Sequence, residues 1–270
     1  MVKLRLFAVT MAIACSLGLS ACSPSTPSAS SPESPAPSAA SPETQPVDGL
    51  TKDIDYLTKL SLMRGHMLVA QELLELEKPA EAEPHIGHPV EEIYADLEDQ
   101  LAERGVAPFK ATLTEVHDLV QNRPSDPQIQ AKFNDAIAAI DGAIAVLPKE
   151  RSQSLDVALP VINNLLDVAQ AEYEAAISNN KISEAIEYQD SRGFVLYAYQ
   201  FLYPSVRDTV RQSNPEAQRQ IEAAFEALQK AWPSAEAPAA PVMTAEEVSA
   251  QVAQIQQGTQ SLQAAPAAQP

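Results

Sequence analysis

Apolar residues recur every three or four positions between residues 49 and about 232, as in Phe133, Ile137, Ile140 and Ile144. This spacing gathers apolar side chains on one face of an α-helix. The same stretch lacks a run in which apolar and polar residues alternate with β-branched enrichment, the pattern that predicts a strand. The sequence therefore predicts an all-α fold: a single helical bundle of about six to eight helices with one substantial core.

Proline, glycine and capping residues mark where these helices are expected to begin and end, and Asn214-Pro215, for example, starts the helix that ends near Trp232. The predicted helices span residues 50–77, 89–105, 108–122, 126–147, 152–178, 183–212 and 215–232. Pro160 is expected to kink one of them unless it lies in an early turn, and Pro204 to interrupt another. After a Pro/Ala linker, Thr244 and Glu247 form a capping box for a short helix ending near Gly258.

The N-terminus has the features of a secretory signal peptide. A positively charged start precedes an apolar stretch, residues 6–19, that is too short to span a membrane. It ends in Leu19-Ser20-Ala21-Cys22, which resembles the lipobox of bacterial lipoproteins, where the peptidase cuts before a lipid-modified cysteine. The resemblance implies that Cys22 carries acyl chains such as palmitate, which anchor the mature chain in a membrane. An ordinary signal peptide with a chance cysteine is the alternative.

The expected organisation has four parts. Residues 1–21 are the signal peptide, and 22–48 are the lipidated cysteine and a Pro/Ser-rich linker that buries too little apolar surface to fold. The helical bundle occupies 49–232, and 233–270 hold the Pro/Ala linker, the short helix and a disordered tail. Cys15 leaves with the signal peptide, so the mature chain forms no internal disulfide.

The expected cellular compartment and the net charge of the chain limit which molecules it can bind. A lipid-anchored chain faces the periplasm or the outer side of the cell envelope, and Ser23 after the anchor does not resemble the acidic inner-membrane retention signal, which favours the outer membrane. The formal charge is -18, and becomes -20 when Lys3 and Arg5 leave with the signal peptide. Such acidity repels nucleic acid and favours cations, basic proteins or uncharged surfaces as partners. Solubility of an exported protein is the simpler explanation of the acidity.

Three of the four histidines fall between residues 66 and 88. Prolines and a glycine around His85 and His88 predict a stiff, irregular approach to the helix that follows. Glu91 and Glu92 lie one turn into that helix, so a His-x-x-Glu pair brings a nitrogen and a carboxylate within reach of one ion. His85 is a third candidate ligand, and His66 a fourth if its helix packs alongside. In the alternative reading, the carboxylates only complement the helix N-terminus and the histidines cap backbone groups.

The donor types decide which metals to expect. Two histidines with a carboxylate suit zinc and non-haem iron, whereas Met63, His66 and Met67 on one helix face form a set that Cu(I) favours. The methionines are equally well explained as core residues. The predicted cofactor is therefore iron, zinc or copper, or none if the histidines are structural. His117, beside two acidic residues, is expected on a solvated face.

A second polar group centres on residues 187–194. Gly193 lies mid-helix, as does Gly65, and mid-helix glycine costs about 1 kcal/mol relative to alanine, which suggests that another helix comes close. A crossing of the two helices would bring polar side chains together: Arg64, His66, Tyr188, Asp190 and Arg192. These residues predict either a buried hydrogen-bonded network or the pocket of a hydrolase or binding protein.

An exported helical domain with a His-x-x-Glu element resembles the imelysin-like proteins, which are periplasmic or lipid-anchored helical proteins linked to iron uptake. Their motif is Gly-x-His-x-x-Glu. His88-Pro-Val-Glu91 matches its second half, whereas Ile86 stands where the glycine belongs and Gly87 comes one place late. The resemblance implies metal handling and not peptidase activity.

The preferred function is therefore a membrane-anchored lipoprotein that binds, senses or transfers a transition metal. The rival is a non-catalytic scaffold or adaptor that binds a protein partner in the cell envelope. The sequence has no Gly-x-Ser-x-Gly, phosphate-binding glycine loop, free cysteine nucleophile or His-Glu-x-x-His, so no catalytic residue is predicted. Convergence of the three histidines with Glu92 would count against the adaptor, and histidines on opposite faces would exclude a shared metal site.

Overall fold

A computed structural model describes residues 49–263. The predicted signal peptide, Cys22, the linker to residue 48 and the end of the predicted tail, 264–270, lie outside the described residues. The α-helices are α1 (Gly49–Glu75), α2 (Pro79–His88), α3 (Glu98–Glu103), α4 (Lys110–Asn122), α5 (Ile129–Ile144), α6 (Lys149–Ser152), α7 (Leu155–Ala176), α8 (Ala185–Tyr197), α9 (Tyr203–Ser213), α10 (Pro215–Leu228) and α11 (Ala245–Gln263). The prediction of an all-α fold is confirmed.

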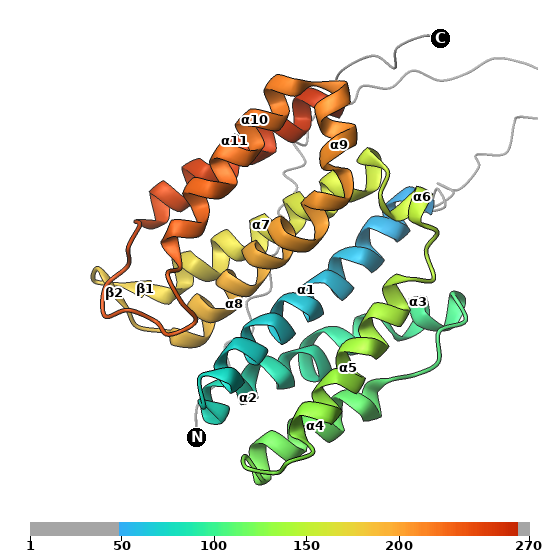
Figure 1. Cartoon of the computed structure of the whole chain (residues 1–270), viewed down its shortest axis with the longest axis vertical. Coiled ribbons are helices and arrows are strands. Elements are labelled where there is room, and N and C mark those ends of the chain that lie inside the picture. Colours follow the sequence, from blue (N-terminus) through green and yellow to red (C-terminus); the bar gives the residue numbers. More distant parts are fainter. Residues whose placement is uncertain (1–48, 264–270) are drawn as a thin grey trace, which may run out of the picture. The chain divides into compact units, whose positions relative to one another are not determined.

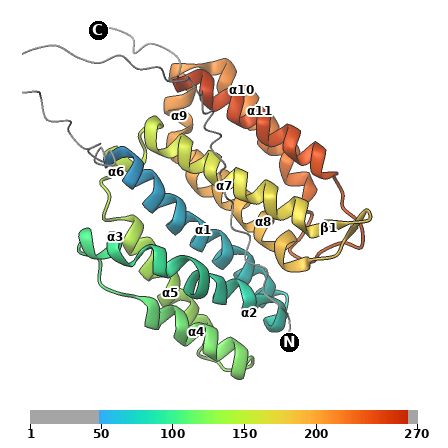
Figure 2. The same ribbon diagram turned by 180° about the vertical axis from the view of Figure 1, so that it is seen from behind.

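Helix α1 runs through the middle of the described fold. Helices α7, α8, α10 and α11 lie on one side of it, and α2, α4 and α5 lie on the other (Figures 1 and 2). Large apolar side chains from both sides are fully buried, among them Leu60 of α1, Ile140 of α5 and Ile162 of α7. Because α1 packs against α2, α5, α7 and α8, it connects the two groups of helices into one core.

The segment with two of the three clustered histidines differs from its prediction. Residues 79–88 form helix α2, where an irregular approach was expected, and the helix predicted to start at Pro89 is instead η1 (Pro89–Ile93), η2 (Tyr94–Asp96) and α3. Pro79 occupies the first helical turn, where its missing N–H is harmless. Pro84 lies inside α2 and removes only one backbone hydrogen bond. His85 and His88 are consequently three positions apart on one face of a helix.

Two five-residue π-helical segments follow prolines or precede them. In η1 the N–H of Tyr94 donates to the carbonyl of Pro89, and η3 (Ala198–Leu202) joins α8 to α9, whose second residue is Pro204. A π-turn inserts one residue into a helix and so absorbs a missing backbone donor without ending it. Contrary to the prediction, the helix is therefore not broken at Pro204 but widens locally into a π-helical segment between α8 and α9. Pro160 lies within α7, which continues past it without a break.

The predicted helix 152–178 ends early in a small hairpin. Ile177–Ser178 (β1) pairs antiparallel with Lys181–Ile182 (β2). Asn179 and Asn180 form the turn with φ of 50° and 57°, the left-handed conformation that asparagine tolerates and that a tight hairpin turn requires.

The caps predicted for the last two helices are confirmed. The Asn214 side chain accepts hydrogen bonds from the backbone N–H groups of Glu216 and Ala217 at the start of α10. The N–H of Thr244 donates to Glu247 at 2.8 Å, and the N–H of Glu247 donates to Thr244 Oγ1 at 3.2 Å, which is the capping box of α11.

Helix α11 packs closely on the bundle and is longer than predicted. A Cβ on Gly258 would lie 2.6 Å from Ile221 Cγ1 of α10, and Thr259 exchanges hydrogen bonds with Asn163 of α7. With α7, α8 and α10 it completes a four-helix arrangement (Figure 1).

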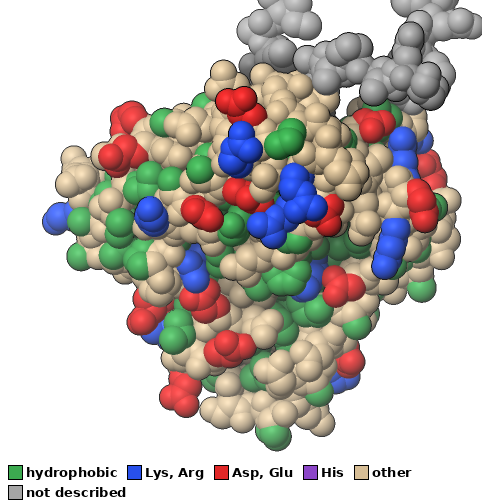
Figure 3. Space-filling view, turned by 45° about the horizontal axis from the view of Figure 1, so that its top comes forward, with side chains coloured by type: hydrophobic (Ala, Val, Ile, Leu, Met, Phe, Trp, Pro, Cys, Tyr) green, Lys and Arg blue, Asp and Glu red, His purple; other side chains and the backbone are tan. Residues whose placement is uncertain are grey.

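No described helix combines the length and the apolar character needed to cross a membrane. Basic side chains alternate with acidic ones over the face shown in Figure 3. That face therefore presents a mixed surface and not a single-sign patch of the kind that binds polyanions.

Candidate metal centre

Three helices bring four potential metal ligands together. His66 comes from α1, His85 and His88 from α2, and Asp190 from α8. One donor atom from each residue lies within 4.8 Å of the others. The side chains of His66, His85 and Asp190 are almost completely buried, and His88 is 22 % exposed. The cluster therefore lies inside the fold, with His88 as its member nearest to solvent.

The Asp190 carboxylate lies at the centre of the cluster. Its Oδ1 lies 2.6 Å from Nδ1 of His66 and 2.7 Å from Nδ1 of His85, and its Oδ2 lies 3.2 Å from Nδ1 of His88. Despite that last distance, the His88 nitrogen is a buried polar atom without hydrogen-bond geometry to any partner in the described residues. A buried donor or acceptor left unpaired is costly, which marks this nitrogen as one that a ligand would satisfy.

Burial and the charges and hydrogen bonds between the cluster residues determine their pKa values. Burial lowers the pKa of His66 more than the neighbouring carboxylate raises it. Burial alone would raise the pKa of Asp190, but the three imidazoles outweigh it and hold the pKa well below the ordinary value. Burial also lowers the pKa of His88, but here the carboxylates of Asp190, Glu92 and Glu172 prevail and raise it. Asp190 is accordingly an anion, the form that binds a cation.

Three further carboxylates, those of Glu92, Glu172 and Glu187, add negative charge near the cluster. Burial, together with the charges of Asp190, Glu187 and Glu92, raises the pKa of Glu172 to about 7. Glu172 is a half-buried residue of α7, and sequence reasoning did not single it out. Burial is the larger cause of this shift and the like charges add to it, so a cation bound nearby would relieve the electrostatic part.

The residues fit a transition metal by donor type and by spacing. Imidazole nitrogens with one carboxylate suit zinc, copper, iron and nickel. Bonds of about 2.0–2.1 Å would place two tetrahedral ligands roughly 3.3 Å apart. The present nitrogen–oxygen distances to Asp190, 2.6, 2.7 and 3.2 Å, are shorter than this, and all four donor atoms lie within 4.8 Å of one another.

The predicted carboxylate ligands do not belong to this group. Glu91 and Glu92 lie in η1 and are exposed, and neither is among the four converging residues. The prediction placed them one α-helical turn after His88, but the π-turn at Pro89 changes their direction. Glu92 acts only through its charge on His88 and Glu172.

The predicted polar network is divided among separate partners. Tyr188 and Arg192 are four positions apart on one face of α8, where they donate to the carbonyls of Ser234 and Trp232. Asp190 points to the opposite face, towards the histidines, because two residues along a helix turn the side chain by about 200°. Arg64 pairs with Asp141 of α5 at 2.8 Å. Of the predicted network, His66 and Asp190 do meet, as part of the candidate metal centre, whereas the other three residues contact separate partners.

A second layer of contacts holds the ligands in place. Nε2 of His85 lies 2.9 Å from Oε1 of Gln189, whose amide nitrogen donates to Glu81 and to the carbonyl of Ala235. The Arg192 guanidinium donates through two nitrogens to Glu72 of α1, at 2.9 Å each. Such bidentate pairs fix geometry as well as adding energy, so α8 is held in register with α1 and α2 beside the cluster.

His117, Met63 and Met67 have packing roles in the fold. His117 was expected on a solvated face, but its side chain is only 14 % exposed, packs against Gly87 and contacts Glu83 at 2.6 Å. It therefore holds α4 against α2. Met63 and Met67 are fully buried core residues.

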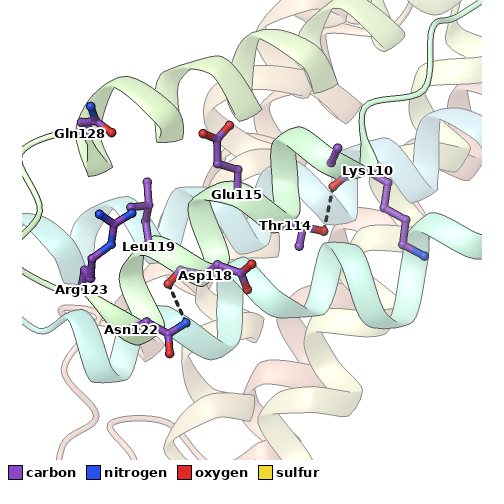
Figure 4. A pocket seen from close by; sticks show the side chains of 9 residues that line it. Lys110, Thr114, Glu115, Asp118, Leu119, Asn122, Arg123 and Gln128 are labelled. Atoms are coloured by element: carbon purple, nitrogen blue, oxygen red, sulfur yellow. Dashed lines mark hydrogen bonds between the residues drawn. The ribbon is translucent and has the colours of Figure 1, made fainter.

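A surface pocket lies elsewhere, along α4. Figure 4 shows Lys110, Asp118 and Arg123 among its lining side chains, and none of the four cluster residues lines it. Its lining carries both signs of charge, Lys110 and Arg123 together with Glu115 and Asp118.

The comparison with protein families concerns the C-terminal part of the chain. Residues 148–266 match the model of the iron permease-associated 4-helix bundle domain. The matched segment holds α7 to α11, the helices of the four-helix arrangement, together with Asp190 and Glu172. The three histidines precede it. No protein with a curated description and no solved structure matches the chain.

The matched domain is described as iron permease-associated, and the similarity of residues 148–266 to it agrees with the expectation of metal handling. The match does not test the resemblance to the imelysin-like proteins, which stays a prediction.

Proposed function

We propose that this chain is a cell-envelope lipoprotein whose helical domain binds a divalent transition metal, physiologically iron, and holds it for transfer. The observation that carries the proposal is the convergence of His66, His85, His88 and Asp190 from three helices on one buried position. His88 adds a buried nitrogen without a hydrogen-bond partner, which a metal bond would satisfy.

Iron is favoured by the family match. Asp190 comes from the segment that resembles the iron permease-associated domain, and the histidines come from the preceding helices, which pack against it. Histidine with carboxylate is also a donor set that Fe(II) accepts in proteins. Zinc and copper accept the same ligand atoms.

The donor arrangement supports binding more than catalysis. Three imidazoles and a carboxylate occupy four coordination positions, whereas catalytic zinc sites use three protein ligands and leave the fourth for water. His88, the most exposed ligand, is the natural point at which the metal enters or leaves. The adaptor function remains the rival, with the cluster as a buried structural network.

The decisive measurement is metal binding by the purified mature chain under anaerobic conditions. Fe(II), Zn(II) and Cu(I) would be titrated by calorimetry, and bound metal counted by elemental analysis. We expect one metal per chain for the wild type and at least about tenfold weaker binding for His88→Ala and Asp190→Asn.

The matched controls are His117→Gln, the histidine outside the cluster, and Asp141→Asn, an aspartate paired with Arg64. Both should bind metal as the wild type does. Equal and negligible binding of all three metals by the wild type and His88→Ala would refute the metal function and leave the adaptor.

A further inference from the structure

Gln189 has an amide whose orientation is fixed by its neighbours. The side chain is buried, and its Nε2 lies 3.0 Å from a carboxylate oxygen of Glu81 and 3.1 Å from the carbonyl oxygen of Ala235. Both partners only accept hydrogen bonds, so the NH₂ group must face them. The amide oxygen then faces Nε2 of His85 at 2.9 Å.

We propose that Gln189 is a positioning residue that keeps the proton of His85 on Nε2 and leaves Nδ1 as the metal-binding atom. The proposal rests on the metal function proposed for this cluster. An amide oxygen accepts and never donates, so Nε2 of His85 must carry the hydrogen of this bond. A neutral imidazole has one N–H, and its lone pair therefore lies on Nδ1.

With the proton on Nε2, the Nδ1 atom of His85 faces Asp190 as a lone pair and not as a hydrogen-bond donor. Nδ1 of His85 lies 2.7 Å from Oδ1 of Asp190, and the imidazole is completely buried. A lone pair against a carboxylate oxygen at this distance is repulsive unless a positive charge, a proton or a metal ion, lies between them. Gln189 thus disfavours the tautomer in which Nδ1 of His85 donates to Asp190, because in that tautomer the bare Nε2 and the amide oxygen, both acceptors, would face each other at 2.9 Å.

Gln189 also has a structural role that is distinct from positioning the proton of His85. The amide also ties α2, through Glu81, to the segment after Trp232, through Ala235. Gln189→Met keeps the length and removes both the acceptor and the donor. Gln189→Glu keeps an acceptor for His85 but loses the donor and sets a second carboxylate against Glu81. The two variants therefore separate the two roles.

The first readout is the protonation of the His85 ring nitrogens in the metal-free mature chain at about pH 8. It is measured by ¹⁵N chemical shifts from two-bond proton–nitrogen correlation, with His85→Ala used for assignment. We expect a protonated Nε2 in the wild type and in Gln189→Glu. In Gln189→Met the proton should move to Nδ1, where Asp190 accepts it. An unprotonated Nε2 in the wild type would overturn the proposal, whether or not the variants fold.

The second readout is zinc affinity, because zinc is diamagnetic and stable in air. Gln189→Met should weaken zinc binding by about 10–100-fold, as loss of such an outer partner typically does. Gln189→Glu should stay within a few-fold of the wild type although its melting temperature falls. Affinity that instead follows thermal stability, with Gln189→Glu the weaker binder, would overturn the proposal. If the wild type bound no metal, the metal function would fail, and the ring protonation would still be tested.

Discussion

Gly65 of α1 and Gly193 of α8 face each other where the two helices cross. A Cβ on Gly193 would lie 2.9 Å from the carbonyl carbon of Gly65 and still closer to its oxygen, and one on Gly65 would lie 2.5 Å from Phe194 Cδ1. His66 adjoins the first glycine, and Asp190 precedes the second by three residues. The contact distance of 2.6 Å between these two ligands therefore depends on the close approach of the two backbones.

Gly193→Ala is expected to destabilise the fold and to weaken the metal centre together. The added methyl has no room, so α8 must move away from α1, and overpacking of this kind costs about 1–3 kcal/mol. The melting temperature and the zinc affinity should both fall. Gly142→Ala is the matched control, because a Cβ there meets nothing within 4 Å. It should be neutral, or more stable by up to about 1 kcal/mol. Similar melting temperatures for the two variants would contradict the role of the crossing.

Glu172→Gln is expected to stabilise the metal-free protein at neutral and alkaline pH. Burial and the charges of Asp190, Glu187 and Glu92 raise the pKa of Glu172 from 4.5 to about 7. A carboxyl group with a raised pKa contributes stability below pH 4.5, and that contribution is lost as pH rises through about 7. Glutamine avoids the loss, so its advantage should grow between these limits and level off at about 1–3 kcal/mol, allowing for partial exposure.

The measurement is urea unfolding of the wild type and Glu172→Gln from pH 4 to pH 8, without metal. Glu174→Gln, an exposed residue of the same helix, is the control and should give a pH-independent difference near zero. A Glu172→Gln advantage that is largest at pH 4 would show that the carboxylate is not the repelled group.

Metal affinity is expected to fall as pH falls. The carboxylates around His88 raise its pKa above 6.5 despite burial, so a proton occupies this ring at pH values where an ordinary histidine is already neutral. Only the neutral ring binds metal, so affinity should fall about tenfold for each pH unit below that pKa, for each proton displaced. Zinc titrations at pH 6, 7 and 8, in two buffers of different ionisation enthalpy, count the released protons. Affinity unchanged over this range, with no proton release, would be inconsistent with His88 as a ligand.

The helices and the three histidines were predictable because periodicity, caps and spacing are local properties. The periodic apolar residues gave an all-α fold, and Asn214, Thr244 and Glu247 gave correct caps. The rarity of mid-helix glycine was enough to predict that Gly65 and Gly193 mark a close crossing.

The complete ligand set was not predictable from local patterns. The crossing predicted from Gly65 and Gly193 correctly placed Asp190 beside His66, but grouped it with Arg64, Tyr188 and Arg192. Its other two partners, His85 and His88, lie 105 and about 100 residues away in the sequence. Pro89 was read as a helix start, but the chain continues through a π-turn that directs Glu91 and Glu92 outwards. Both errors concern the direction of a side chain, which depends on tertiary packing.

Cys22 lies outside the described residues, and its lipidation is testable independently of the metal centre. Cells that express the full chain and receive labelled palmitate should incorporate label into the wild type and not into Cys22→Ala, because the thiol is the predicted acceptor. The wild type should sediment with membranes and leave them only with detergent, since several acyl chains hold a protein firmly.

Ser23→Ala is the control and should behave as the wild type in labelling and sedimentation. Zinc affinity should be equal for Cys22→Ala and the wild type, because the four converging ligands all lie between residues 66 and 190. Label retained by Cys22→Ala would place the anchor elsewhere. Absence of label in the wild type would support the ordinary signal peptide, and would leave the metal centre on a chain released into its compartment.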